Sequence, residues 1–216
     1  ETLSSHPEVD MVSFTGSTGA GVSVSQAAAP TVKRVTLELG GKSANVILDD
    51  ADIAKAAKTA VYACFNNSGQ ECSSLSRLIV PATARDEVVE VIAATMARYS
   101  VGDPMDESMR CGPMVSARQQ ESVAGYIASG IAEGATLVAG GEGMPDGLDS
   151  GFYVKPTVFA DVSPDMTIFR EEIFGPVLSI TTYDSEEEAI VLANDSEYGL
   201  SGGVWSGNEE RALQFA

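Results

Sequence analysis

Histidine and cysteine are both scarce in this sequence of 216 residues. The single histidine, His6, is far along the chain from any candidate partner, which argues against a Cys–His pair and a Ser–His–Asp triad and gives a metal site little support. The three cysteines, Cys64, Cys72 and Cys111, are odd in number and have no Cys-x-x-Cys spacing. Neither a disulfide framework nor a structural zinc site is therefore expected, and a reducing cytoplasm is the expected compartment.

Basic residues and long apolar runs are also lacking. Lysine and arginine together number 13 against 31 acidic residues, which gives a formal net charge of -18. Such a surface repels phosphate backbones, so nucleic acid is not an expected partner, and the acidic excess is typical of a solvated surface. No apolar run approaches the roughly 18 residues that a membrane span requires, and no membrane association is expected.

The chain has no initiator methionine, and it ends inside a predicted helix, "ERALQFA". We therefore expect a fragment of a longer protein. With 44% apolar and 20% charged residues the composition is that of a soluble globular protein, long enough to bury a sizeable core in one or two domains.

Strand and helix signals alternate along the whole chain. Strands are expected at 9–16, 32–39, 44–50, 76–82, 135–141, 152–162, 175–184 and 200–206. Helices are expected at 51–65, 83–99, 116–134 and from 185 onward, with caps supplied by the acids that end segment 44–50 and by Thr83, Ser116 and Ser185. This order predicts a three-layer α/β fold, in which helices cover both faces of a mostly parallel twisted sheet.

Glu38 is the first candidate for a functional side chain. It lies near the end of the 32–39 strand, on the face opposite Leu37 and Leu39, directly before Gly40 and Gly41. Functional groups of open α/β sheets gather at the carboxyl ends of the strands, and glycines let other groups approach the backbone closely. A site carboxylate is one interpretation, and a solvated or ion-paired residue is the other.

Cys72 is the second candidate. In "FNNSGQECSS" (65–74) it is surrounded by amide and hydroxyl side chains and follows Gly69, which frees the loop backbone to present amides. Cys64 belongs to an apolar helical stripe and Cys111 has no positioned polar neighbours, so both are expected to be structural. Because a thiol with a pKa near 8.5 is only a few per cent thiolate at neutral pH, a nucleophile needs local donors or dipoles. Spacing alone leaves nucleophile and packing residue equally open for Cys72, and with histidine so scarce any base must be a carboxylate.

Four ordered motifs carry a resemblance to a known family. They are "FTGSTGAG" (14–21), "LELGGKSA" (37–44), "GQEC" (69–72) and "EEIFGPV" (171–177). Any one of them alone is a weak signal, since Gly-rich turns are common. In this order they resemble the NAD(P)-dependent aldehyde dehydrogenase superfamily over essentially the whole chain.

The resemblance implies a domain organisation. Residues 1–38 would be the C-terminal remnant of a dinucleotide-binding domain, and residues 39–216 a catalytic domain that stops before an oligomerisation segment. The parent protein would be a homo-oligomer. The family's oxyanion-hole asparagine and its main adenosine contacts would lie before residue 1.

The resemblance also implies a reaction, in which an aldehyde is oxidised to a carboxylic acid. Cys72 matches the nucleophile, which would form a thiohemiacetal and then a thioester, and Glu38 matches the base that activates water for deacylation. Relatives that pass the acyl group to coenzyme A do not need this base, so Glu38 favours hydrolysis, and coenzyme A acylation stays the enzymatic alternative. A second alternative is that the chain by itself is inactive and serves as a structural or self-associating module.

The implied cofactor is NAD or NADP. Gly16 and Ser17 match the segment that approaches it, in keeping with amides at a helix N-terminus facing phosphate charge. Glu172 matches the residue that hydrogen-bonds the nicotinamide ribose, and Phe174 the one that packs near the nicotinamide. No metal is implied.

One departure concerns the helix expected at 116–134. Gln119 falls where some relatives place a cofactor-contacting glutamine, but Ser122 stands where a lysine is expected.

Overall fold

The structure is a computed structural model that describes residues 2–216. It consists of two compact units, divided between Gly41 and Lys42, and each is described by itself. The assignment of the first unit to a dinucleotide-binding domain and of the second to a catalytic domain stays a prediction.

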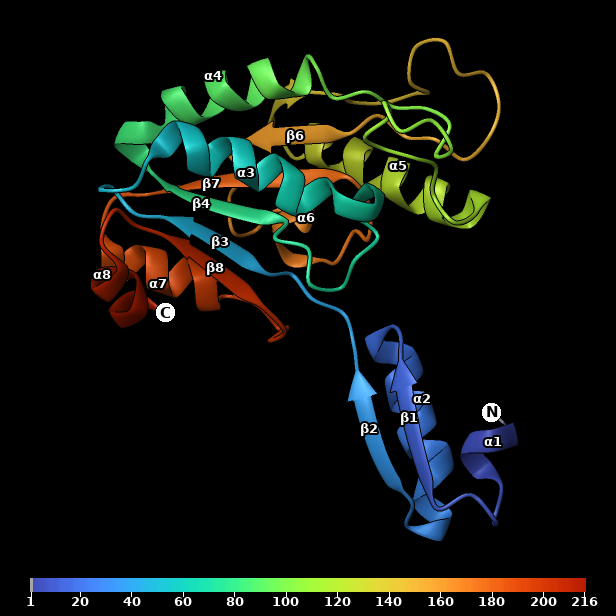
Figure 1. Ribbon diagram of the computed structural model, residues 1–216. Coiled ribbons are helices and arrows are strands. Elements are labelled where there is room, and N and C mark those ends of the chain that lie inside the picture. Colours follow the sequence, from blue (N-terminus) through green and yellow to red (C-terminus); the bar gives the residue numbers. More distant parts are fainter. Residues whose placement is uncertain (1) are drawn as a thin grey trace. The chain divides into compact units, whose positions relative to one another are not determined.

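The first unit is a βαβ motif preceded by a short helix (Figure 1). β1 and β2 pair in parallel, and Thr15 lies opposite Glu38 at their carboxyl ends. In both strands exposed residues alternate with half-buried ones, as predicted for 32–39, and Glu38 is the last residue of its strand. The elements are α1 (Thr2–Ser5), β1 (Met11–Thr15), α2 (Thr18–Ala28), the 3-10 turn η1 (Ala29–Thr31) and β2 (Arg34–Glu38).

The second unit is built on a six-stranded sheet with the order β5-β6-β7-β4-β3-β8. All neighbouring strands run parallel except β5 and β6, so the prediction of a mostly parallel sheet is confirmed. The strands are β3 (Ala44–Ile47), β4 (Arg77–Pro81), β5 (Thr136–Ala139), β6 (Thr157–Ala160), β7 (Val177–Tyr183) and β8 (Gly202–Trp205).

Helices cover both faces of this sheet, which confirms the predicted three layers. α3 and α4 pack on one face through a core cluster that includes Val61 and Ile92, while α5, α6 and α7 pack on the other through a cluster that includes Ile127 and Leu192. Figure 1 shows α3 on the side of the sheet opposite α7 and α8. The helices are α3 (Ile53–Phe65), α4 (Arg85–Met96), α5 (Ala117–Ala132), α6 (Thr167–Arg170), α7 (Glu186–Asn194) and α8 (Glu209–Phe215), with 3-10 turns η2 (Asn66–Gly69) and η3 (Ala82–Ala84).

The predicted helix caps are only partly confirmed. Ser116 and Ser185 accept hydrogen bonds from the amides three residues on and cap α5 and α7. The prediction for Thr83 was wrong, because Thr83 lies inside η3 and α4 begins after it without a side-chain cap. The acids at the end of segment 44–50 do not cap α3 either, since Asp52 accepts the hydrogen bond from the Lys55 amide.

The strand predicted at 152–162 is much shorter than expected. β6 spans only Thr157–Ala160. Pro156 has no N–H to donate to a ladder, which explains why regular pairing begins just after it.

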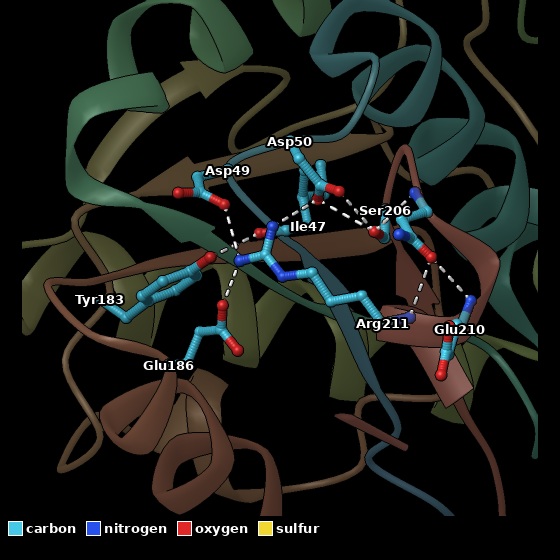
Figure 2. A network of polar contacts seen from close by, with 9 residues as sticks. Ile47, Asp49, Asp50, Tyr183, Glu186, Ser206, Glu210 and Arg211 are labelled. Atoms are coloured by element: carbon cyan, nitrogen blue, oxygen red, sulfur yellow. Dashed lines mark hydrogen bonds and ion pairs between the residues drawn. The ribbon is translucent and has the colours of Figure 1, made fainter. Parts of the chain in front are cut away.

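Asp49 and Asp50, the acids that end segment 44–50, bind Arg211 at the carboxyl edge of the sheet (Figure 2). The Arg211 guanidinium lies 2.7 Å from Asp49 and 2.8 Å from Asp50, and it also pairs with Glu186. Ser206, which follows β8, donates to the Asp50 carboxylate. An ion-pair network thus closes the carboxyl ends of neighbouring strands β3 and β8.

Candidate active site

Cys72 lies on a tight turn just before β4. The Ser74 amide donates to the Glu71 carbonyl at 3.1 Å, which places Cys72 and Ser73 in the middle of the turn. The Cys72 side chain is half-buried. This turn presents the thiol at the amino end of a central strand of the sheet.

Polar contacts hold the turn on both sides of Cys72. The Glu71 carboxylate accepts from the Asn66 amide at 2.9 Å and from the Ser73 hydroxyl at 3.1 Å. The Ser74 hydroxyl donates to the Cys64 carbonyl at 3.0 Å, which ties the turn to the end of α3. Short local bonds therefore fix the backbone that carries the thiol.

A contact from a distant strand holds the same turn. The Ser201 hydroxyl donates to the Ser73 carbonyl at 3.0 Å and lies 2.9 Å from the Ser43 hydroxyl. Ser43 precedes β3 and Ser201 precedes β8, and β4, β3 and β8 are parallel neighbours. The starts of three strands therefore meet at one edge around the Cys72 turn.

The segment that leads into the turn has an unusual backbone. Asn67, Ser68 and Gly69 have φ values of 49°, 58° and 70°, in the left-handed region. At Gly69 an added Cβ would lie 2.2 Å from the carbonyl oxygen of Gly175, a backbone atom that cannot move aside easily. Only glycine fits there. The "GQEC" motif consequently packs directly against the "EEIFGPV" motif.

The "EEIFGPV" segment precedes β7, the other neighbour of β4. Phe174 is 38% exposed and has a φ of 53°, and Glu172 is half-buried. A Cβ on Gly175 would lie 2.4 Å from the Val123 side chain of α5. The segment is thus packed between Gly69 and α5. Gly69 and Gly175 thus bring the loop of Cys72 and the loop of Glu172 and Phe174 together at the amino edge of the sheet.

This placement differs from the rule that functional groups gather at carboxyl ends. Glu38 lies at the carboxyl end of β2. In the second unit the carboxyl edge carries the Arg211 network, whereas Cys72 precedes β4, and Glu172 and Phe174 precede β7.

The other two cysteines are structural, as predicted. Cys64 is fully buried, and burial raises the pKa of its thiol to about 12. Cys111 is also buried, which raises its pKa as well. Both thiols are therefore held protonated at neutral pH, and Cys72 is the accessible one of the three.

The residues predicted for the first unit lie together within that unit. The Gly16 amide donates to the Glu38 carbonyl at 3.0 Å, and Ser17 caps α2 by accepting from the Ala20 amide at 3.3 Å. A Cβ on Gly16 would lie 2.6 Å from the Phe14 ring, so the ring would have to move to make room for a side chain. Glycine keeps the backbone open at the N-terminus of α2, beside the strand end that carries Glu38.

Sequence reasoning missed two buried cations at the amino edge. Arg77 is 2% exposed and donates to the carbonyls of Lys42, Leu192 and Ala193. Lys42 is also 2% exposed, but its Nζ has no hydrogen-bond partner within residues 2–216. Burial lowers the pKa of Lys42 to about 7, with smaller effects from Cys64 and Arg77. No sequence signal distinguishes these residues from surface lysines and arginines.

Comparison with known proteins decides the family. The family model described as "Aldehyde dehydrogenase family" matches residues 1–216. The chain belongs to the aldehyde dehydrogenase family. It is 56% identical over 214 residues to 3-succinoylsemialdehyde-pyridine dehydrogenase of a Pseudomonas species, covering 99% of this chain and 45% of that protein.

Solved aldehyde dehydrogenases share this fold closely. A mutant aldehyde dehydrogenase C from Pseudomonas syringae in complex with NAD+ and octanal matches with a TM-score of 0.98 at 48% identity, over 99% of this chain and 44% of that one. The Mycobacterium tuberculosis aldehyde dehydrogenase in complex with NAD+ matches with a TM-score of 0.95 at 48% identity, over 98% and 44% of the two chains. The chain spans about 45% of the length of the curated relatives it matches.

Residues 2–216 contain neither a candidate membrane-spanning helix nor a candidate metal-binding cluster. No helix in this range combines the length and the apolar character of a membrane span. The same residues hold no group of three or more histidine, cysteine or acidic side chains placed to bind a metal ion.

Proposed function

We propose that the whole protein oxidises an aldehyde to a carboxylic acid with NAD or NADP, using Cys72 as nucleophile and Glu38 as base. The observation that carries this proposal is the contact between Gly69 and Gly175, which joins the turn of Cys72 to the segment of Glu172 and Phe174. Family membership supports the reaction class.

In the first step the Cys72 thiolate adds to the carbonyl carbon of the aldehyde. A C–S bond forms, and the π electrons of the carbonyl move to its oxygen, which becomes an oxyanion. Such a charge needs preorganised donors, and we assign the backbone N–H of Cys72 as one of them. The hydrogen bonds of Glu71 and Ser201 keep this backbone fixed while the charge develops.

A bound nicotinamide dinucleotide would accept the hydride that leaves the thiohemiacetal carbon. Glu172 and Phe174 are assigned to the nicotinamide end, and Gly16 and Ser17 to the approach of the cofactor. The residues fit this group, because Gly16 leaves the backbone bare at the start of a helix within a βαβ unit. Related structures contain NAD+.

Deacylation completes the reaction. Glu38, exposed at the end of β2, takes a proton from water, and the resulting hydroxide attacks the thioester carbon. The C–S bond breaks and the acid leaves, Glu38 releases its proton to solvent, and the Cys72 thiolate is restored for the next turnover.

The test is Glu38→Gln in the full-length enzyme, followed by rapid mixing with aldehyde and NAD+. Glutamine cannot take the proton, so we expect a burst of NADH close to one per site and a steady rate reduced by about 100-fold or more. Glu90→Gln, at an exposed position of α4, is the matched control and should leave both phases unchanged. An unchanged steady rate in Glu38→Gln would exclude the deacylation role.

Coenzyme A acylation is the enzymatic alternative. Analysis of the products with and without coenzyme A separates the two reactions, because hydrolysis gives the free acid in both cases. The inactive, self-associating module is the alternative for the 216-residue chain by itself. Self-association of that chain without turnover would favour this alternative.

We further propose a cytoplasmic homo-oligomer that binds a small aldehyde and neither nucleic acid nor membrane. The shortage of cysteine pairs and the net charge of -18 support the compartment and the exclusion of nucleic acid. Sedimentation of the full-length protein measures the assembly.

A further inference from the structure

We propose that Gln119 is a positioning residue, which holds Phe174 in its left-handed conformation and thereby presents Glu172 and Phe174 to the cofactor. The inference rests on the proposed function, because it takes the assignment of these two residues to the cofactor from there. Gln119 lies on α5 and contacts the backbone of Ile173 and Phe174, more than fifty residues away in sequence.

The side-chain amide of Gln119 binds the two peptide groups that flank Phe174. Its Nε2 donates to the Ile173 carbonyl at 3.1 Å and to the Phe174 carbonyl at 2.9 Å. A glutamine amide nitrogen carries two hydrogens, and these two carbonyls take both. Both N–H groups of Gln119 are therefore directed to the backbone of the loop.

The backbone at Phe174 needs such a contact. Its φ of 53° is a left-handed conformation that a bulky residue adopts only when the surroundings impose it. Strain of this kind concentrates at functional sites, where it presents a side chain that would otherwise relax. Two hydrogen bonds to adjacent carbonyls oppose the rotation that would return Phe174 to an ordinary conformation.

The same face of α5 contacts the segment at two further points. Residues 119, 123 and 126 lie on one side of the helix at the spacing i, i+4, i+7. Val123 packs on Gly175, and the Tyr126 hydroxyl donates to the Glu171 carboxylate at 2.7 Å. Burial is the main cause that raises the pKa of Tyr126 to about 12, so this phenol keeps its proton. Segment 171–175 is thus held along its length by three residues of α5, Gln119, Val123 and Tyr126.

The test compares Gln119→Ala and Gln119→Glu with Gln120→Ala. Gln120 is the matched control, because its amide donates to a backbone carbonyl of another loop, that of Tyr153 at 2.7 Å. Hydrogen exchange of residues 171–176 is measured in the 216-residue chain without cofactor, and NADH affinity in the full-length enzyme by fluorescence. Circular dichroism verifies that each variant is folded.

Both Gln119 variants should accelerate exchange in 171–176 by about three- to tenfold and weaken NADH binding by a similar factor, the range expected for the loss of one or two ordinary hydrogen bonds. Gln119→Glu is close to isosteric but offers a carboxylate to two carbonyls, so it should fail as Ala does. Gln120→Ala should change neither quantity.

Unchanged exchange in both Gln119 variants would overturn the positioning role. Weaker NADH binding with unchanged exchange would overturn it too, since that is the signature of direct contact with the cofactor. Faster exchange with unchanged NADH affinity would overturn the link from Phe174 to the cofactor. A wild-type enzyme that binds no NADH would instead defeat the proposed function, and the exchange data would still decide whether Gln119 holds the loop.

Discussion

At the scale of single residues, the two buried cations of the amino edge behave in opposite ways. The Arg77 guanidinium is rigid and rich in donors, and it satisfies the carbonyls that end α7. Lys42 is equally buried but its ammonium has no hydrogen-bond partner within residues 2–216. Burial of an unpaired ammonium favours its neutral form, which is why its pKa is lowered to about 7.

The pH dependence of stability follows from this shift. The folded-state pKa of Lys42 lies below the ordinary lysine value of 10.5, so the unfolded chain binds more protons between these two pKa values and stability rises with pH across that window. Lys42→Met removes the titration. From pH 7 to pH 9 the free energy of unfolding of the wild-type chain should therefore rise by about 2 kcal/mol relative to that of Lys42→Met.

Urea unfolding of the 216-residue chain at the two pH values measures this difference. Lys58→Met, at an exposed position of α3, is the control and should follow the wild type. Parallel curves for wild type and Lys42→Met would show that Lys42 does not titrate in this range.

At the scale of elements, much of the second unit could be predicted from sequence. Strand and helix order followed from local periodicity, and Ser116 and Ser185 followed from capping chemistry. The cap predicted at Thr83 was wrong because a 3-10 turn precedes α4, and the sequence around Thr83 does not reveal this turn. Local patterns therefore predicted the caps of α5 and α7 but failed where a 3-10 turn comes before the helix.

The candidate site shows where sequence reasoning stops. Glu38 and Cys72 could be singled out by their positions and by a family resemblance. The contacts from Ser201 to the Cys72 turn and from Gln119 to Phe174 join residues 128 and 55 positions apart, and no periodicity encodes such pairs. The edge of the sheet at which the loops gather also depends on tertiary packing, which the rule for carboxyl ends did not anticipate.

The close approach of Gly69 to Gly175 predicts that Gly69→Ala greatly lowers the free energy of unfolding. A left-handed alanine costs about 1 kcal/mol, and the clash with the Gly175 carbonyl should add about 1–3 kcal/mol. Gly143→Ala is the control, because its φ is 85° but an added Cβ meets no atom within 4 Å. Urea unfolding should show a loss of about 2–4 kcal/mol for the first variant and about 1 kcal/mol for the second. Equal losses of unfolding free energy in the two variants would mean that the close approach of Gly69 and Gly175 does not contribute to stability.

At the scale of the whole molecule, the proposed chemistry is divided between the two units. Glu38 and the segment of Gly16 and Ser17 belong to the first unit, whereas Cys72 and Phe174 belong to the second. The βαβ unit has two parallel strands and places Glu38 at the end of β2, whereas the larger unit has a mostly parallel sheet and carries Cys72 and Phe174 in loops at its amino edge. The proposed reaction requires a bond between the carbonyl carbon of the aldehyde and the sulfur of Cys72.

The decisive measurement is mass spectrometry of the full-length Glu38→Gln enzyme, quenched after mixing with NAD+ and an aldehyde that the wild-type enzyme oxidises. We expect one acyl group per chain, located by peptide mapping on Cys72, and none when NAD+ is omitted. An acyl group on Cys64 or Cys111, or none on any cysteine while NADH still forms, would contradict the role of Cys72.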